Sequence, residues 1–452
     1  MSWATRRVRQ KIPPESTDLQ RDFHGMIDMG NTDGMAERNV ENQAPHKTDH
    51  IEKVKLRVGD LRPGMFVCEL DRPWLETPFL FQGFEVKSDE DIATIQRYCE
   101  YVYIDLLRTR MVEIALDAAP PPRSYINRGG PHSFEKEIET AQVTRERTSG
   151  LVKSFIDEIR FGKSVDVSLA KAAVAECVAS IMRNPDAMTF MARMRGKDEG
   201  ISQHAFNCCI YAIMLGTQAG LDARELENLG TCGLLHDVGK VSVPDKILNK
   251  PGRLDPEELA VARSHALLGR DILMSGRNTF SGTVDAAYGH HEHLDGTGYP
   301  RGLEGHQLNL NCKIIAIVDR YDALVNVRPF RPAYHHLDAL RILNKMMTAN
   351  HLDSGLTTAF TACLGVYPPG TVVELSNGEV AIVLQSNPKQ RLRPQILVIR
   401  DPAAKPVEIP VDMALRDADA QGRPYKIKSV HRPEDFGIDL EKYRGAILQS
   451  LG

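Results

Sequence analysis

Three features are missing from this 452-residue sequence, and each absence excludes a class of protein. No apolar run approaches the roughly 20 residues that a helix needs to cross a bilayer. The N-terminus is basic but lacks the apolar segment of a secretory signal. The eight cysteines form no CxxC pair, which argues against a disulfide framework or a cysteine zinc site. We therefore predict a cytoplasmic protein with reduced cysteines and no membrane span.

The sequence also lacks an excess of charge of either sign. Its 56 Lys and Arg residues against 60 Asp and Glu residues give a net charge of −4. Affinity for nucleic acid depends on many lysine and arginine contacts to phosphate. A weakly acidic chain is therefore not expected to bind DNA or RNA, although locally placed cations can still hold a small anionic ligand.

The length exceeds that of one hydrophobic core and predicts two to four domains. Residues 1–52 are rich in charged and amide side chains and poor in aliphatic ones, so we expect a disordered tail. Residues 53–117 alternate apolar and polar positions around a helical segment at 89–98, which predicts a small α+β N-terminal domain. Residues 118–189 predict a proline- and glycine-rich linker followed by connecting helices.

The second half of the chain changes from helical to strand-like patterns. Residues 190–365 predict a mainly α-helical domain, including one helix over 257–272 that carries His265. After a Pro-Pro-Gly break, residues 366–452 predict a short β-rich C-terminal module that contains a hairpin with its turn at Asn377-Gly378. The predicted fold class is therefore multidomain, with a mainly α-helical domain between a small α+β domain and a short β-rich module.

Histidines and aspartates recur along the helical region. His236-Asp237 follows an apolar stretch, and two adjacent side chains cannot share one helix face. At a helix end, however, both can turn toward one point. Imidazoles and carboxylates from several helices suit first-row divalent metal ions. The other candidate ligands are His204, His265, His290, His291 and Asp319.

Taken singly, these residues have ordinary explanations. A lone histidine on a helix, such as His204 or His265, is more often a satisfied core or surface residue than a metal ligand. The pair His290-His291, followed by Glu292, fits a solvated polar run equally well. Only their joint order and separation point to a common site.

The candidate ligands belong to a longer series of motifs. These are LLHDVGK at 234–240, VPDKIL at 243–248, KPG at 250–252, Ser264-His265, HHEHLDGTGYP at 290–300, DRYDAL at 319–324 and RPFR at 328–331. Their order resembles the HD-GYP family, the branch of the HD superfamily that hydrolyses the bacterial second messenger cyclic di-GMP. The resemblance spans about residues 190–365 and implies that this region is the catalytic domain. Two flanking segments resemble, more weakly, the uncharacterised N-terminal domain and the short C-terminal tail of the same subgroup.

The resemblance implies two metal ions, iron or manganese. His204, His236, Asp237 and Asp319 would surround one ion, and Asp237 would bridge to a second ion held by His265, His290 and His291. Two cations lower the pKa of a bridging water, and the resulting hydroxide would attack phosphorus. Some family members hold a third ion through a glutamate at the position of Gly200, where glycine has no ligand atom, so we expect two.

The resemblance also implies the substrate and the residues that contact it. Lys240 would act in catalysis beside Asp237 and contact one phosphate of cyclic di-GMP, and Arg328 and Arg331 would hold the other. We expect hydrolysis to the linear dinucleotide pGpG, and a second step to GMP is left open. Two alternatives stay open: a catalytically silent cyclic di-GMP receptor, and a hydrolase of another cyclic dinucleotide.

The sequence leaves more than one role open for Asp322 and for the loop at 295–300. Asp322 lies three residues after Asp319 on nearly the same helix face, so we expect it to hydrogen-bond a metal ligand rather than to bind metal. The loop at 295–300 would shape the pocket, meet a partner protein at Gly298-Tyr299-Pro300, or position His290 and His291, and the last is the minimum role. A homodimer is also left open.

Overall fold

The structure is a computed structural model, and several expectations fall outside the residues it describes. These expectations concern the predicted disordered tail, the linker over 118–131, Arg328 and Arg331. None of the described helices is both long and apolar enough to span a membrane. The described residues are 53–72, 77–79, 84–86, 88–105, 132–194, 200–327, 332–387 and 389–443.

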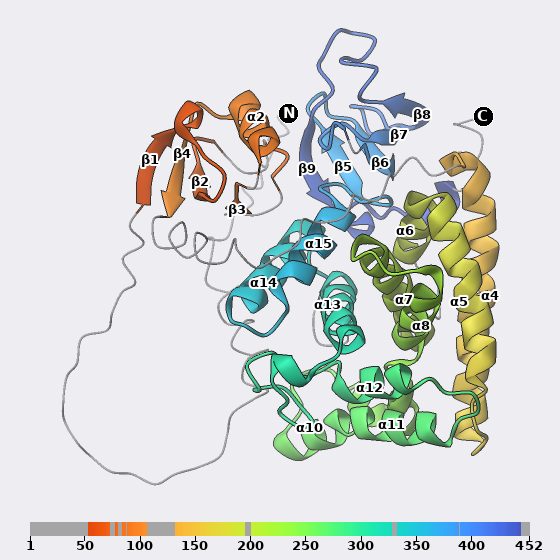
Figure 1. Cartoon of the computed structure of the whole chain (residues 1–452). Coiled ribbons are helices and arrows are strands. Elements are labelled where there is room, and N and C mark those ends of the chain that lie inside the picture. Colours follow the sequence, from red (N-terminus) through yellow and green to blue (C-terminus); the bar gives the residue numbers. More distant parts are fainter. Residues whose placement is uncertain are drawn as a thin grey trace, which may run out of the picture. The chain divides into compact units, whose positions relative to one another are not determined.

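The N-terminal part is a small α+β unit, as predicted (Figure 1). Helix α2 (Asp89–Tyr98) begins at a capping box, in which the Ser88 hydroxyl accepts from Asp91 N and the Asp91 carboxylate accepts from Ser88 N. The hydrophobic core of this N-terminal unit includes Val67, Ile95 and Val102. The antiparallel strands lie in the order β1-β4-β2-β3: β1 (Lys53–Arg57), β4 (Tyr101–Asp105), β2 (Phe66–Leu70) and β3 (Phe84–Glu85).

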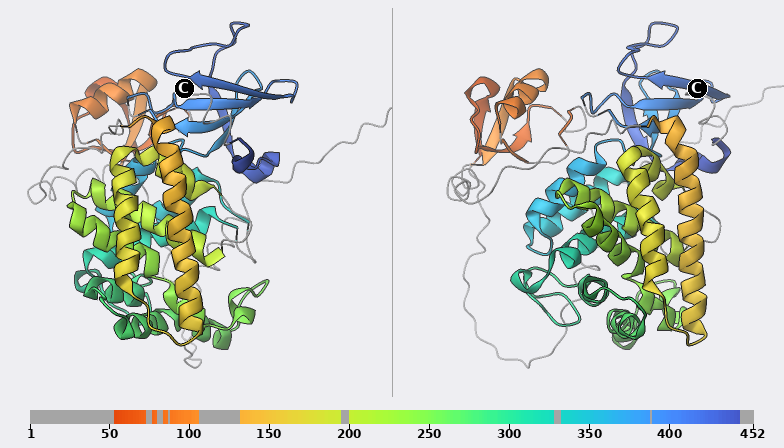
Figure 2. Two further views of the ribbon diagram at one scale, coloured as in Figure 1. Left: turned by 90° about the vertical axis from the view of Figure 1, so that its right-hand side faces the viewer. Right: turned by 45° about the vertical axis from the view of Figure 1, so that its right-hand side comes forward.

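The middle of the chain is helical, also as predicted. Every residue of α7 (Gly200–Gln218) from Ser202 to Gly216 is buried, and a helix that is covered on all sides belongs in the interior. Figure 2 shows α4 (Phe134–Arg160) and α5 (Val167–Arg183) side by side along one flank of this core. The other helices are α6 (Pro185–Arg193), α8 (Ala223–Leu235), α9 (Asp245–Leu248), α10 (Pro256–Arg263), α11 (His265–Ser275), α12 (Ser281–Gly289), α13 (Leu310–Val325), α14 (His336–Thr348) and α15 (Ser354–Leu364).

The single helix predicted over 257–272 is wrong, because the chain breaks it into α10 and α11 at Ser264. The Ser264 hydroxyl donates to Val261 O at 2.7 Å, and His265 Nδ1 donates to Ala262 O at 2.7 Å. Side chains that hydrogen-bond nearby carbonyls compete with the continuing helix. His265 consequently opens α11 instead of lying in the middle of a longer helix.

The C-terminal part is a five-stranded antiparallel sheet in the order β8-β7-β6-β5-β9. The predicted hairpin is present between β5 and β6, and Gly378 in its turn has φ = 90°, which favours glycine. One sheet face packs on the helices and shares their core through Ile382, Leu384 and Leu397. The strands are β5 (Val372–Leu375), β6 (Val380–Gln385), β7 (Gln395–Arg400), β8 (Pro406–Asp412) and β9 (Ile427–His431).

Candidate metal centre

Close packing of α8 on α7 brings together His204 of α7 and His236 at the end of α8. A Cβ added to Gly233 of α8 would lie 2.8 Å from Cys208 O of α7, so the two backbones meet only because this residue is glycine. Helix α8 ends at Leu235, His236 caps it, and Asp237 precedes the 3-10 helix η3 (Val238–Ser242). The chain therefore turns at His236-Asp237, as the motif predicted, and both side chains face inward.

A second close approach delivers His265. A Cβ at Gly239 of η3 would lie 2.0 Å from His265 O and 2.4 Å from Gly269 N, so η3 rests directly on the first turn of α11. His290 caps the end of α12. The last candidate, Asp319, is buried within α13.

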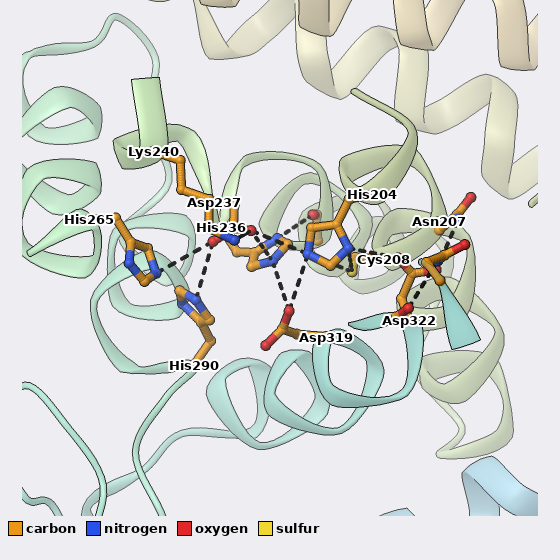
Figure 3. Close-up of polar contacts among 12 residues, drawn as sticks. His204, Asn207, Cys208, His236, Asp237, Lys240, His265, His290, Asp319 and Asp322 are labelled. Carbon is orange, nitrogen blue, oxygen red and sulfur yellow. Dashed lines mark hydrogen bonds and ion pairs between the residues drawn. The ribbon is translucent and has the colours of Figure 1, made fainter. Parts of the chain in front are cut away.

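Asp237 lies at the centre of the cluster (Figure 3). Its Oδ2 is 3.2 Å from His204 Nε2 and 3.5 Å from His236 Nε2. Its Oδ1 is 3.5 Å from His265 Nε2 and 3.6 Å from His290 Nε2. The two oxygens of one carboxylate thus face two different pairs of histidines.

Asp319 and His291 complete the cluster. Asp319 Oδ1 is 3.1 Å from His204 Nε2, and its Oδ2 is 3.9 Å from His291 Nδ1. His291 Nε2 is 3.0 Å from His265 Nε2. All seven candidate ligands are therefore brought together and are buried. Lys240 joins them through an ion pair with Asp237.

Hydrogen bonds behind the rings determine which nitrogen faces the cluster. His236 Nδ1 donates to Gly233 O at 2.8 Å, and His265 and His290 make equivalent Nδ1 bonds to carbonyls of their own helical turns. A carbonyl can only accept, so Nδ1 carries the proton and the neutral ring presents a bare Nε2 to the cluster. Metal-binding histidines are held in this way in proteins.

Several buried polar atoms in the cluster have no hydrogen-bond partner among the residues that the structure describes. An unsatisfied buried polar group costs about 1–3 kcal/mol, so a concentration of such groups in one place calls for an explanation. Divalent cations would use these atoms as ligands, and the imidazole and carboxylate donors fit them. The atoms are His236 Nε2, Asp237 Oδ1, His290 Nε2 and His291 Nδ1.

The electrostatics of the cluster suit cation binding. Burial opposes ionisation of Asp237, but Lys240 and the surrounding histidines outweigh it and hold the pKa of this carboxyl well below its usual range. Burial lowers the pKa of His265 to about 4 and also lowers the pKa values of His290 and His291. At neutral pH the carboxylate is charged and these three rings are neutral, as metal coordination requires.

His204 differs from the other rings. Burial opposes its protonation, but Cys208 and three carboxylates around it raise its pKa well above the usual value. Its Nδ1 donates to Asp322 Oδ2 at 2.7 Å, while its Nε2 faces Asp237 and Asp319. A proton and a cation therefore compete for His204 Nε2.

Two neighbours of His204 were missed in the sequence. Cys208 lies one turn later in α7 with its Sγ 3.8 Å from His204 Nδ1, and burial raises the pKa of this thiol to about 12, so it stays protonated. Asn207 Nδ2 donates to Asp322 Oδ1 at 2.8 Å. Spacings of three and four residues from His204 were the available signal. Asp322 is a hydrogen-bond partner of His204, as expected.

The loop after His291 packs against the candidate ligands. The Tyr299 ring stacks on His291 with centroids 4.7 Å apart, and Tyr299 N donates to His291 O at 3.2 Å. The Glu292 carboxylate accepts from Arg301 N at 2.8 Å and from Leu303 N at 3.0 Å. These contacts support the minimum role for the loop, which is to position the histidine pair.

Known protein families match three parts of the chain. The family model described as an HD domain matches residues 184–356. A domain of unknown function, DUF3391, matches residues 53–170, and a KOW domain associated with HD domains matches residues 372–416. The three matches together span most of the described chain.

Individual proteins of known function or structure are also similar to this chain. A cyclic di-GMP phosphodiesterase of Pseudomonas aeruginosa is 31% identical over 414 residues, which cover 88% of this chain and 97% of that protein. A 3'3'-cGAMP-specific phosphodiesterase of Vibrio cholerae is 34% identical over 35% of this chain and 36% of its own. Among solved structures, an HD-GYP-like protein of Bdellovibrio bacteriovorus aligns over 69% of this chain and 99% of its own, with 16% identity and a TM-score of 0.44.

Proposed function

The chain belongs to the HD-GYP family of cyclic di-GMP phosphodiesterases, and from that premise we propose that it hydrolyses cyclic di-GMP to pGpG at the cluster around Asp237. Whether a second step yields GMP is an outcome of the product analysis below. The observation that carries the proposal is that both oxygens of this one buried carboxylate face histidines, from four separate segments. Such a carboxylate is suited to bridging two cations.

The chain's own residues would bind and orient the reactants. Divalent ions held in the cluster would lower the pKa of a coordinated water and so supply the nucleophile at neutral pH. The carbonyl-bonded rings of His236, His265 and His290 would keep their Nε2 atoms aimed at the ions. Lys240, whose side chain is 21% exposed, would present its ammonium to a phosphate oxygen of the substrate.

We propose two ions per chain, iron or manganese. Two groups of potential ligands support the number. One is His204, His236 and Asp319, with the Cys208 thiol beside them, and the other is Asp237, His265, His290 and His291. The mixture of imidazole and carboxylate donors supports the choice of metals. At the start of α7, Gly200 offers no donor for a third ion.

The role of two arginines rests on the family resemblance alone. Arg328 and Arg331 are proposed to hold the second phosphate. A homodimer, a protein partner at Gly298-Tyr299-Pro300 and the domain boundaries at residues 117, 189 and 365 also stay predictions. A cytoplasmic location is supported by the eight free cysteines.

Two other functions are kept as outcomes of the test. Similarity to a 3'3'-cGAMP-specific enzyme keeps another cyclic dinucleotide as a second candidate substrate. A silent receptor would bind cyclic di-GMP and release no product.

Replacement of the central carboxylate tests the function. We expect Asp237→Asn to reduce turnover of cyclic di-GMP at least about 100-fold, because one bridging oxygen and its charge are lost. Anaerobic hydrolysis with product identification, for cyclic di-GMP and for 3'3'-cGAMP, measures this turnover. Analysis of the same samples for iron and manganese should show two ions per chain falling to one or none.

Asp271→Asn is the matched control, because Asp271 is an exposed carboxylate of α11 that pairs with Arg270 and lies outside the cluster. Full turnover by Asp237→Asn would reject the proposed centre. A metal-loaded wild-type chain that binds cyclic di-GMP without releasing product would establish the receptor instead.

A further inference from the structure

A second group of potential metal ligands lies outside the proposed centre. His293, Asp295 and His351 each offer one ligand atom, and these atoms lie within 4.8 Å of one another. The imidazoles of His293 and His351 are stacked, with centroids 4.3 Å apart and an interplanar angle of 11°. Asp295 Oδ2 is 3.4 Å from His351 Nε2. None of the three has a role in the proposed hydrolysis.

The fold holds the two segments of this group in a fixed relation. His351 follows α14, where Asn350 adopts a left-handed φ of 58° and His351 N donates to Met346 O at 2.9 Å, which closes the helix end. Leu294 N, between the two loop ligands, donates to His351 O at 3.2 Å. Because backbone hydrogen bonds join the segments, the donors sit on a preorganised frame.

The carboxylate has one oxygen available for a cation. Asp295 Oδ1 accepts from Thr297 N at 3.0 Å and from Thr297 Oγ1 at 2.7 Å, whereas Oδ2 faces His351. The side chains of His351 and Asp295 are 17% and 27% exposed, so an ion can arrive from solvent and keep a water ligand. The charge of Arg320 opposes a cation near His293, and the charge of Asp295 counters part of this repulsion.

We propose that His293, Asp295 and His351 form a second metal site, which takes a single dication of the Zn²⁺ class. Two imidazoles and one carboxylate with an open fourth position are a ligand set that such ions accept. The bound ion would fasten the loop after α12 to the end of α14. Since Tyr299 of the same loop stacks on His291, the ion would also restrain the surroundings of the proposed catalytic centre.

A purely hydrogen-bonded latch is the competing explanation. Thr297 Oγ1 bonds both to His293 Nδ1, at 3.0 Å, and to Asp295 Oδ1. Removing this hydroxyl weakens a latch but leaves all three metal donors in place. Removing a donor abolishes the metal site. The two explanations therefore predict different results for different variants.

The test counts zinc bound to the full-length protein after the chain has been stripped with a chelator, titrated with Zn²⁺ and separated from free ion. We expect the wild-type chain to retain one more Zn²⁺ equivalent than His351→Asn, and Thr297→Val to retain as many as the wild type. His306→Asn, an exposed histidine of the same region, is a control expected to bind like the wild type.

Equal zinc counts in the wild type and His351→Asn would overturn the proposal, and so would loss of an equivalent in Thr297→Val. If His351→Asn does not fold, as judged by circular dichroism, Asp295→Ala replaces it under the same criterion. The result is a difference between variants, so it stands or falls independently of how many ions the centre around Asp237 holds.

Discussion

Asp322 shows how a buried carboxylate can determine the chemistry of a neighbouring side chain. Both of its oxygens are used, one by His204 Nδ1 and the other by Asn207 Nδ2. With Nδ1 donating to Asp322, His204 must direct Nε2 toward Asp237 and Asp319. The negative charge of Asp322 also makes the ring a stronger donor to a cation.

Replacing Asp322 by asparagine should therefore weaken metal binding without removing a ligand. We expect Asp322→Asn to lower metal affinity about 10- to 100-fold, the range found when hydrogen-bond partners of metal ligands are changed. Competition with a chromophoric chelator measures the affinity. Asp285→Asn serves as the control, since Asp285 accepts from Asn309 and contacts no ligand. Equal affinity in the two variants would contradict this role of Asp322.

At the scale of elements, one buried carboxylate joins the two long flanking helices. Glu137 of α4 is completely buried and accepts from Arg183 Nε at 2.7 Å and Ser180 Oγ at 2.7 Å, both on α5. His132 Nδ1 lies 3.0 Å from Glu137 Oε2, the oxygen that also accepts from Arg183 Nε. Burial would raise the pKa of Glu137, but Arg183, Ser180 and His132 together lower it below its usual value.

Breaking this connection should destabilise the helical core. We expect Glu137→Gln to reduce the free energy of unfolding by about 1–3 kcal/mol, because Arg183, whose side chain is 30% exposed, loses its charged hydrogen-bond partner. Urea denaturation measures this, with Glu139→Gln, exposed on the same helix, as the control. The folded pKa is depressed, so the stabilisation is present above pH 4.5 and disappears as the pH falls through the folded value. A difference that persists in full at pH 2 would refute the linkage.

At the scale of the whole molecule, His336 links three helices in the interior. Its Nδ1 lies 2.8 Å from Tyr321 Oη of α13, and its Nε2 donates to Gly365 O after α15 at 3.0 Å. Burial, together with the charge of Arg193, lowers the pKa of His336 to about 3. Both ring nitrogens are used in the neutral form, so protonation disrupts a junction of the core.

His336 should make the fold sensitive to acid. Between about pH 6.5 and pH 3 the unfolded chain binds a proton at this residue that the folded chain does not, so stability falls as pH falls, by about 1.4 kcal/mol per pH unit. We expect His336→Gln to lose this part of the slope, and His306→Gln, which is exposed, to keep it. Denaturation curves between pH 6 and pH 4 give the slopes. Parallel slopes in all three proteins would be evidence against the assignment.

Part of the candidate site and several elements of the fold could be predicted from the amino-acid sequence. The turn at His236-Asp237, the hairpin at Asn377-Gly378 and helix α2 depend on neighbours along the chain, so local patterns were sufficient for them. The break at Ser264 was missed, because the apolar spacing continues through it while the competing side-chain hydrogen bonds leave no periodic signal.

By itself, the sequence determined the chemical nature of the centre: which imidazoles and carboxylates are available, and at which ends of helices. Only the tertiary structure decided that Asp237 faces both groups of histidines, that Asp322 orients His204, and that His351 meets His293. The reason is physical. Residue types and helix ends are local properties, whereas distances between segments depend on close packing, such as the backbone contacts allowed at Gly233 and Gly239.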